Sequence, residues 1–246
     1  MKQVYLGAMG WSYSFWPIYN DASPTEYLHR YSLSFNSVEV NNTFYRIPRK
    51  SSVENWNQKT PDGFKFAVKI PQSISHSSGL NYDPEKLDVF LDHIKPFGDK
   101  LGPLLLQLPP RLSSAHGEQL DTLLEQLQGF RVAVEFRHKD WFKEATYRLL
   151  RDHNAALVYV EHPWQPSEEV ETSDFIYVRL EGDRKKVDGE KGEVQQDRSS
   201  DNLRWAEKIH KNNKSTYLYV SKYYSGYPPT DIQQIKIGLE ALKKNK

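Results

Sequence analysis

The feature that most constrains the fold of this chain is a series of short apolar runs that end in a charged or amide residue just before a turn. Such runs are typical of parallel strands, which are buried on both faces of the sheet in α/β folds. Polar side chains at the carboxyl ends of such strands lie where α/β folds place their chemistry. Six runs have this form, over residues 37–41, 65–69, 103–107, 131–137, 157–161 and 175–179. Two more runs, over residues 5–9 and 216–220, complete a set of eight predicted strands.

Segments with helical periodicity separate the predicted strands. Apolar residues recur at i, i+3, i+4 and i+7 over residues 87–94 and again over residues 120–127. Asp83-Pro84 predicts a helix start, and the segments 23–26 and 51–54 have the form of capping boxes. Further helices are predicted over residues 143–152, 201–211 and 230–243. The alternation predicts one α/β domain over residues 1–246, with the βα unit repeated nearly eight times.

Two connections depart from this alternation. Residues 162–173 contain two prolines and several glutamates, so the segment is too short and too broken for a full helix. We therefore expect a reduced or missing helix after the sixth strand. Residues 181–200 are dense in Gly, Asp, Lys and Arg and lack apolar periodicity, which predicts a long loop after the seventh strand. That loop is either a solvated excursion or a mobile lid.

Alternation along each strand predicts which side chains face inward, since successive residues point to opposite sides of a sheet. In the fifth strand Val132 and Val134 face one way and Glu135 and Arg137 the other. If the sheet closes, the polar residues at the strand ends meet inside one end of the barrel, where they would perturb one another's pKa values. The alternative is a buried network whose charges only neutralise one another. The predicted set is Glu39, Asn41, Lys69, Gln107, Glu135, Arg137, Glu161 and Arg179.

Three histidines, His76, His138 and His162, also follow predicted strands. They lack the i, i+4 spacing of a metal-binding pair on a helix, so any metal site with the glutamates would be assembled from separate loops. A loop hydrogen bond is the simpler role for each of them. His138, beside Arg137, is the best candidate for proton transfer. We predict no cofactor and no metal ligand.

Composition excludes several classes of protein. The 33 Lys and Arg nearly balance the 32 Asp and Glu for a net charge of +1, which argues against a general nucleic-acid binder. The chain has no cysteine, so disulfides, thiolate nucleophiles and Cys-ligated metals are absent. No signal-like segment or membrane span is evident, and we expect a cytoplasmic protein without membrane contact. Aromatic residues, 13% of the chain, fill the barrel mouth or stack on a ligand.

Several segments resemble the DUF72 family of YecE-like proteins, in the same order over almost the whole chain. Val38-Glu39-Val40-Asn41-Asn42-Thr43-Phe44-Tyr45 and Gln107-Leu108-Pro109-Pro110 are the most specific of them. The resemblance implies an irregular TIM-type (β/α)8 barrel and implies no reaction, because the family is one of unknown function. The family pattern matches here at Trp11, Glu39, Asn41, Tyr45, Lys69, His76, Gln107, Glu135, Arg137, His138, Trp141 and Arg179.

The resemblance weakens toward the C-terminus. Val220-Ser221-Lys222 stands where many relatives have an Asn pair, Glu161-His162-Pro163 replaces an Asp-containing sequence, and Glu181-Gly182-Asp183 replaces a His-Gly-Arg-like stretch. These differences indicate a subgroup with its own ligand. Lys222 would make the mouth of the barrel more cationic.

The residues favour an enzyme that acts on a small, anionic or sugar-like metabolite by acid–base chemistry. Glu39, Glu135 and His138 are the predicted catalytic residues. A metal-dependent hydrolase or isomerase is one alternative, and a non-catalytic barrel that binds a ligand or a nucleic-acid end is another. The oligomeric state is not predicted. The predicted substrate-binding residues are Trp11, Asn41, Tyr45, Lys69, His76, Gln107, Arg137, Trp141, Glu161 and Arg179.

Overall fold

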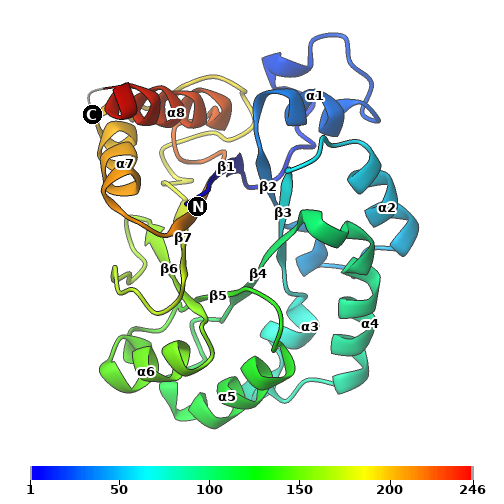
Figure 1. Cartoon of the computed structure of the whole chain (residues 1–246), viewed down its shortest axis with the longest axis vertical. Coiled ribbons are helices and arrows are strands. Elements are labelled where there is room, and N and C mark those ends of the chain that lie inside the picture. Colours follow the sequence, from blue (N-terminus) through cyan, green and yellow to red (C-terminus); the bar gives the residue numbers. More distant parts are fainter. Residues whose placement is uncertain (1, 245–246) are drawn as a thin grey trace.

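Eight parallel strands form one barrel sheet in the computed structural model, which describes residues 2–244 (Figure 1). The hydrogen-bonded order is β1-β8-β7-β6-β5-β4-β3-β2, so strands that follow one another in the chain lie side by side. The predicted (β/α)8 barrel is confirmed. The strands are β1 (Val4–Ala8), β2 (Ser37–Val40), β3 (Lys65–Lys69), β4 (Leu101–Gln107), β5 (Val132–Glu135), β6 (Ala156–Glu161), β7 (Phe175–Leu180) and β8 (Ser215–Val220).

Helices surround the barrel (Figure 1), and their apolar faces pack against the outer faces of the strands. They are α1 (Tyr27–Ser34), α2 (Lys50–Gln58), α3 (Gln72–Ser75), α4 (Pro84–Ile94), α5 (Gly117–Gln126), α6 (Glu144–Asp152), α7 (Ser199–Lys211) and α8 (Pro228–Lys244). Asp83 caps α4 as predicted, accepting a hydrogen bond from Glu85 N at 3.1 Å. The predicted cap at Ser51 is wrong, because α2 begins at Lys50 with Arg49 at the N-cap position. Within residues 2–244, no helix is both long and apolar enough to cross a membrane.

Two long connections carry neither helix nor strand, over residues 162–174 and 181–198. The second lies against the loop that follows β8, since Gln195 N donates to Ser225 O at 2.7 Å. Gly192 in this segment has a φ of +67°, and a Cβ there would lie 2.2 Å from the carbonyl oxygen of Phe15. The segment is therefore packed closely against its neighbours, and only glycine fits at that contact.

The interior of the barrel changes from aromatic at the amino-terminal end to charged at the carboxyl-terminal end. Tyr5 and Tyr217 stack at 4.7 Å in the first layer, and Tyr177 and Tyr219 lie 5.2 Å apart in the next. The Tyr177 hydroxyl then donates to Glu39 Oε2 at 2.7 Å. An aromatic floor thus supports a charged layer at the end of the barrel where such folds carry their sites.

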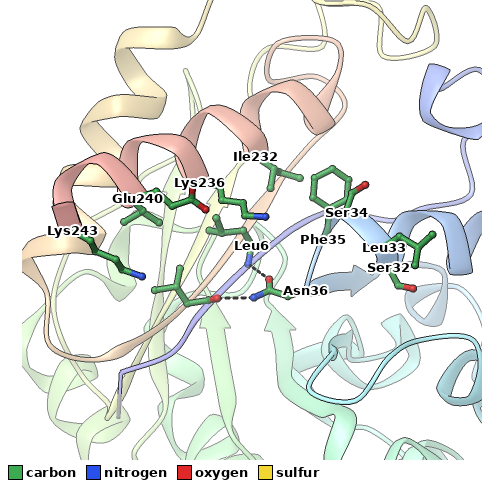
Figure 2. A pocket seen from close by; sticks show the side chains of 12 residues that line it. Leu6, Ser32, Leu33, Ser34, Phe35, Asn36, Ile232, Lys236, Glu240 and Lys243 are labelled. Carbon is green, nitrogen blue, oxygen red and sulfur yellow. Dashed lines mark hydrogen bonds between the residues drawn. The ribbon is translucent and has the colours of Figure 1, made fainter.

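Side chains close the seam between β1 and β2, which are the two ends of the strand order. Asn36 accepts from Leu6 N at 2.9 Å and donates to Val4 O at 2.8 Å (Figure 2), as a neighbouring peptide group would. The Tyr31 hydroxyl accepts from Ala8 N at 2.7 Å and donates to Ser37 O at 2.8 Å. A groove of about 380 Å³ lies outside this seam, between α1 and α8.

Candidate functional site

A cluster of eight polar side chains fills the carboxyl-terminal end of the barrel, and we call it the mouth cluster. Alternation along the strands brings these side chains to the inner face, where they replace the apolar residues of the lower layers. Seven of its members were predicted from the sequence, and Glu181 was not. The mouth cluster comprises Glu39, Asn41, Lys69, Gln107, Glu135, Arg137, Arg179 and Glu181.

Arg179 is the centre of the mouth cluster, and only 3% of its surface is exposed. Its guanidinium pairs with Glu39 through two bonds, Nε to Oε2 and Nη2 to Oε1, both 3.0 Å long. Nη1 donates to Glu135 Oε2 at 2.5 Å and also to Glu181 Oε1. Nη2 in addition contacts the Met9 sulfur at 3.4 Å. Each guanidinium nitrogen of Arg179 therefore already has a protein partner, so this residue supports the site from below.

A second chain of hydrogen bonds runs across neighbouring strands from Lys69 to Glu135. Lys69 Nζ donates to Gln107 Oε1 at 2.7 Å, and Gln107 Nε2 donates to Glu135 Oε1 at 2.8 Å. The register of the sheet produces this chain, because Gln107 and Glu135 are directly paired in β4 and β5. Arg137 forms an ion pair with Glu135 through Nε and donates from Nη2 to Glu181 Oε1 at 2.9 Å.

Burial and neighbouring charges set the protonation of these groups. Burial alone would raise the pKa of Glu135, but Arg179 and Arg137 outweigh it and lower that pKa to about 2. Burial also works against the charge of Arg179, yet Glu39, Glu135 and Glu181 raise its pKa well above the usual value. Glu135 is therefore an anion at neutral pH and has no proton to donate.

Lys69 differs from the arginines because its nitrogen has no carboxylate partner in the part of the chain that the structure describes. Burial, followed by the nearby charge of Arg179, lowers the pKa of Lys69 to about 8. The ammonium group lies 4.3 Å from the centre of the Phe44 ring. Lys69 is thus the group of the mouth cluster that can exchange a proton near neutral pH.

Only part of the mouth cluster can be reached by solvent. Glu39 and Glu135 are fully buried, whereas 16% of the Arg137 side chain and 12% of the Glu181 side chain are exposed. Lys69 is 9% exposed. A molecule that enters the mouth would therefore meet Lys69, Arg137 and Glu181 before either of the two predicted catalytic glutamates.

His76 and Tyr45 flank the mouth cluster through the Phe44 ring. The His76 imidazole packs edge-on against Phe44 at 4.9 Å, and Tyr45 packs against the same ring at 5.2 Å. Burial, then the charge of Lys69, lowers the pKa of His76 to about 4, so the imidazole is neutral at pH 7. Its Nδ1 lies 3.0 Å from Ser75 Oγ. The Tyr45 side chain is 76% exposed and free to contact a bound molecule.

The predicted inward orientation of Glu161 is wrong. The inner residues of β6 are Ala156, Val158 and Val160, so alternation turns Glu161 to the outside. There it accepts hydrogen bonds from Arg204 Nη2 at 2.8 Å and Trp205 Nε1 at 2.6 Å. Glu161 therefore ties β6 to helix α7.

Three other predicted site residues lie outside the mouth cluster. The Trp141 side chain is buried, stacks on Phe136 at 4.7 Å and donates to Leu112 O at 2.7 Å, which places it in the core between barrel and helices. Trp11 packs against Trp56 at 5.3 Å. His138 Nδ1 accepts from Asp140 N at 3.2 Å, so it caps the short helix Lys139–Trp141.

Sequence alternation could have identified Glu181, which was missed. Glu181 follows Arg179 by two positions and so shares the inward face of Tyr177 and Arg179. Among residues 2–244, no group of three or more His, Asp or Glu side chains is arranged to hold a metal ion.

Comparison with known proteins finds relatives that share the family name UPF0759. UPF0759 protein YecE of Escherichia coli K12 is 33% identical over 140 residues, which cover 56% of this chain and 50% of YecE. UPF0759 protein YunF of Bacillus subtilis 168 is 30% identical over 154 residues, covering 58% of this chain and 54% of YunF. The matched region thus spans about half the length of these curated relatives.

The fold comparison agrees with the sequence comparison. The crystal structure of a DUF72 family protein from Thermotoga maritima MSB8 superposes with a TM-score of 0.80 at 29% identity, covering 97% of this chain and 99% of that chain. The sequence profile described as "Protein of unknown function DUF72" matches residues 5–246. With the profile extending over nearly every residue, the chain belongs to the DUF72 family.

Proposed function

We propose that the chain is an enzyme that acts on a small, polar, anionic metabolite at the carboxyl-terminal mouth of the barrel, by proton transfer. One observation carries the proposal: three carboxylates of the mouth cluster are bound to Arg179, while Lys69 has only Gln107 as its hydrogen-bond partner. A lysine that has no carboxylate partner and lies at the end of a barrel strand can exchange protons with a ligand. Its neighbour Arg137 adds positive charge at the accessible side.

The accessible side chains divide between binding and proton transfer. Arg137 would hold a carboxylate or phosphate of the metabolite, and Gln107 would orient the Lys69 nitrogen. Lys69 and the neutral His76 have pKa values on either side of pH 7, about 8 and about 4, so one can donate a proton where the other accepts it. Tyr45 would cover the ligand from the solvent side.

Glu39 and Glu135 take a supporting role in this proposal. Both are fully buried, and both are ion-paired with Arg179. A carboxylate held in this way fixes the position and charge of its arginine, and its removal would leave that charge unpaired. We assign to Glu39 and Glu135 the positioning of Arg179 and Gln107, and not the acid–base step.

The proposal is tested by ligand binding and turnover in the same set of variants. We expect inorganic phosphate and small carboxylates to shift the NMR signals of Lys69 and His76, and Lys69→Met and Arg137→Met to weaken that binding about tenfold or more. Arg184→Met, on the exposed part of the loop after β7, is the matched control and keeps the wild-type affinity. Wild-type affinity in both mouth variants would refute the site.

A non-catalytic binding barrel is the second candidate, and the complete burial of Glu39 and Glu135 is the observation that favours it. The two candidates are distinguished by incubating the protein with a mixture of metabolites and following each compound by proton NMR. Consumption of one compound, lost in His76→Gln with its binding retained, supports the enzyme. Binding without consumption supports the carrier or sensor, and binding of oligonucleotide ends in preference to free phosphate supports the nucleic-acid alternative.

A further inference from the structure

We infer that the Lys69 amine is a nucleophile and that it captures the carbonyl group of the metabolite as an imine. The inference rests on the proposed function and narrows its substrate class to aldehydes and ketones that also carry a carboxylate or phosphate. Such a molecule presents a carbon for the Lys69 nitrogen and an anionic group for Arg137. Covalent capture by lysine is the chemistry expected of a desolvated amine beside another cation.

The structure holds the Lys69 nitrogen in one place. Thr43 Oγ1 donates to the Lys69 carbonyl oxygen at 2.6 Å, which ties the end of β3 to the loop after β2. The Phe44 ring lies 4.3 Å from the nitrogen, and Gln107 Oε1 is its hydrogen-bond acceptor at 2.7 Å. Gln107 cannot turn away freely, because its own amide nitrogen is bound to Glu135. The nitrogen is therefore oriented before a ligand arrives.

The surroundings also favour the uncharged amine. Burial is the main cause of the lowered pKa of Lys69, and Arg179 adds a like charge next to it. The nearby glutamates offset only part of this effect, because they are ion-paired with Arg179 and Arg137. With a pKa of about 8, about a tenth of the amine is unprotonated at pH 7. A typical exposed lysine with a pKa near 10.4 is unprotonated in fewer than about one molecule in a thousand at that pH.

The step balances without an oxidant or a reductant. The Lys69 lone pair forms a bond to the carbonyl carbon, the carbonyl electron pair moves to oxygen, and one proton passes from the nitrogen to that oxygen to give a carbinolamine. The nitrogen lone pair then forms the carbon–nitrogen double bond as the hydroxyl group leaves with a proton as water, and loss of the second nitrogen proton replaces the proton used. His76, which is neutral and contacts the same Phe44 ring as Lys69, would relay these protons.

Trapping with a hydride donor tests the inference. The protein is incubated with glyoxylate, which carries an aldehyde and a carboxylate, and cyanoborohydride reduces any imine to a stable secondary amine that peptide mass spectrometry locates. Lys65, at the opposite end of the same strand and hydrogen-bonded to Asp99 O, is the internal reference. Burial lowers the pKa of Lys65 as well, which makes it a stringent reference. At pH 8 we expect Lys69 to be modified at least about tenfold faster than Lys65, because the Lys69 nitrogen is oriented and lies beside the anion-binding Arg137.

The variants separate this inference from the proposed function. Lys69→Arg keeps the positive charge but cannot form an imine, so modification at position 69 disappears, whereas Lys65→Arg leaves it unchanged. Propanal, which lacks an anionic group, should react with Lys69 more slowly than glyoxylate does. Equal rates of modification of Lys69 and Lys65 in the wild-type protein overturn the inference that Lys69 is a nucleophile. If phosphate still binds at the mouth in that case, the proposed function stands without the imine; if phosphate does not bind either, both fail.

Discussion

Arg179 and Glu39 form a two-bond ion pair inside the barrel, Nε to Oε2 and Nη2 to Oε1, with both distances 3.0 Å and both side chains almost fully buried. A paired guanidinium and carboxylate are tolerated in such a place because each offsets the desolvation of the other. The same arginine also binds Glu135 and Glu181. This arrangement leaves Lys69 as the cation of the mouth cluster without a carboxylate.

Loss of Arg179 should strongly destabilise the fold. In Arg179→Met the buried Glu39 and Glu135 lose their main partner, and we expect the free energy of unfolding to fall by about 3–5 kcal/mol in urea titrations. Adding Glu39→Gln to Arg179→Met should recover part of that loss, because one unpaired charge is removed. Arg184→Met, at an exposed position, should change stability by less than about 0.5 kcal/mol. A loss of similar size in both single variants would contradict the central role of Arg179.

The Tyr31 hydroxyl group should contribute measurably to the seam between β1 and β2, beside the Asn36 side chain. Tyr31→Phe leaves the buried Ala8 N and Ser37 O without their partner, which we expect to destabilise the protein by about 2–3 kcal/mol. The Ala8 amide should also exchange faster with deuterium. Tyr45→Phe changes an exposed side chain and serves as the control. Unchanged exchange at Ala8 in Tyr31→Phe would mean that the strands are held by other contacts.

Asp231 should make stability depend on pH in the opposite sense to a surface ion pair. Burial raises its pKa to about 6, while Ser225 and Asn202 hydrogen-bond the carboxylate. The folded state therefore binds the Asp231 proton more tightly than the unfolded state does. The contribution of Asp231 to stability is favourable below pH 3.8 and is lost as the pH rises through 6. Relative to wild type, Asp231→Asn should gain about 2–3 kcal/mol between pH 4 and pH 7.5.

The matched control for Asp231 is Asp197, an exposed residue whose pKa is lowered by hydrogen bonds from Ser199. Asp197→Asn should lose stability relative to wild type over the same pH range, because a lowered pKa contributes stability at higher pH. A flat difference between Asp231→Asn and wild type from pH 4 to pH 7.5 would show that folding does not raise the pKa of Asp231.

His76 should stay neutral well into the acid range. Burial and the charge of Lys69 lower its pKa to about 4, so the imidazole resonances in NMR should not shift between pH 8 and pH 5.5. Lys69→Met removes the positive charge that contributes to the lowered pKa of His76, so the midpoint of the His76 titration should rise. His29, an exposed residue of helix α1, is a reference signal in the same spectra. A His76 midpoint near 6.5 that does not change in Lys69→Met would contradict the coupling between the two groups.

Alternation within β2, β3, β5 and β7 predicted the members of the mouth cluster that these strands carry. Glu39, Lys69, Glu135 and Arg179 each share a face with small or aromatic inner residues, and the barrel brings them together. Glu161 was assigned by its place at the end of a run, and parity in β6 turns it outward. A polar residue at a strand end thus indicates a site only when its face is known.

Contacts between distant segments could not be predicted from the sequence. That Arg179 would take up three carboxylates, and that Trp141 would stack on the outer side of Phe136, depends on distances that no local pattern contains. The hydrogen bonds by which Asn36 closes the seam could not be predicted either, since they join residues at least 30 positions apart. Helix boundaries moved by a few residues where capping was misassigned, as at Ser51.

The central claim is that Arg179 binds the carboxylates and leaves Lys69 as the proton-exchanging group of the mouth cluster. The pKa of Lys69 tests this claim most directly. The measurement is a pH titration of the lysine side-chain ¹³Cε signals by NMR, with the Lys69 signal assigned by its absence in Lys69→Arg. We predict a midpoint of about 8 for Lys69 in the wild-type protein. A midpoint near 10.4, the value of an ordinary exposed lysine, would contradict the account.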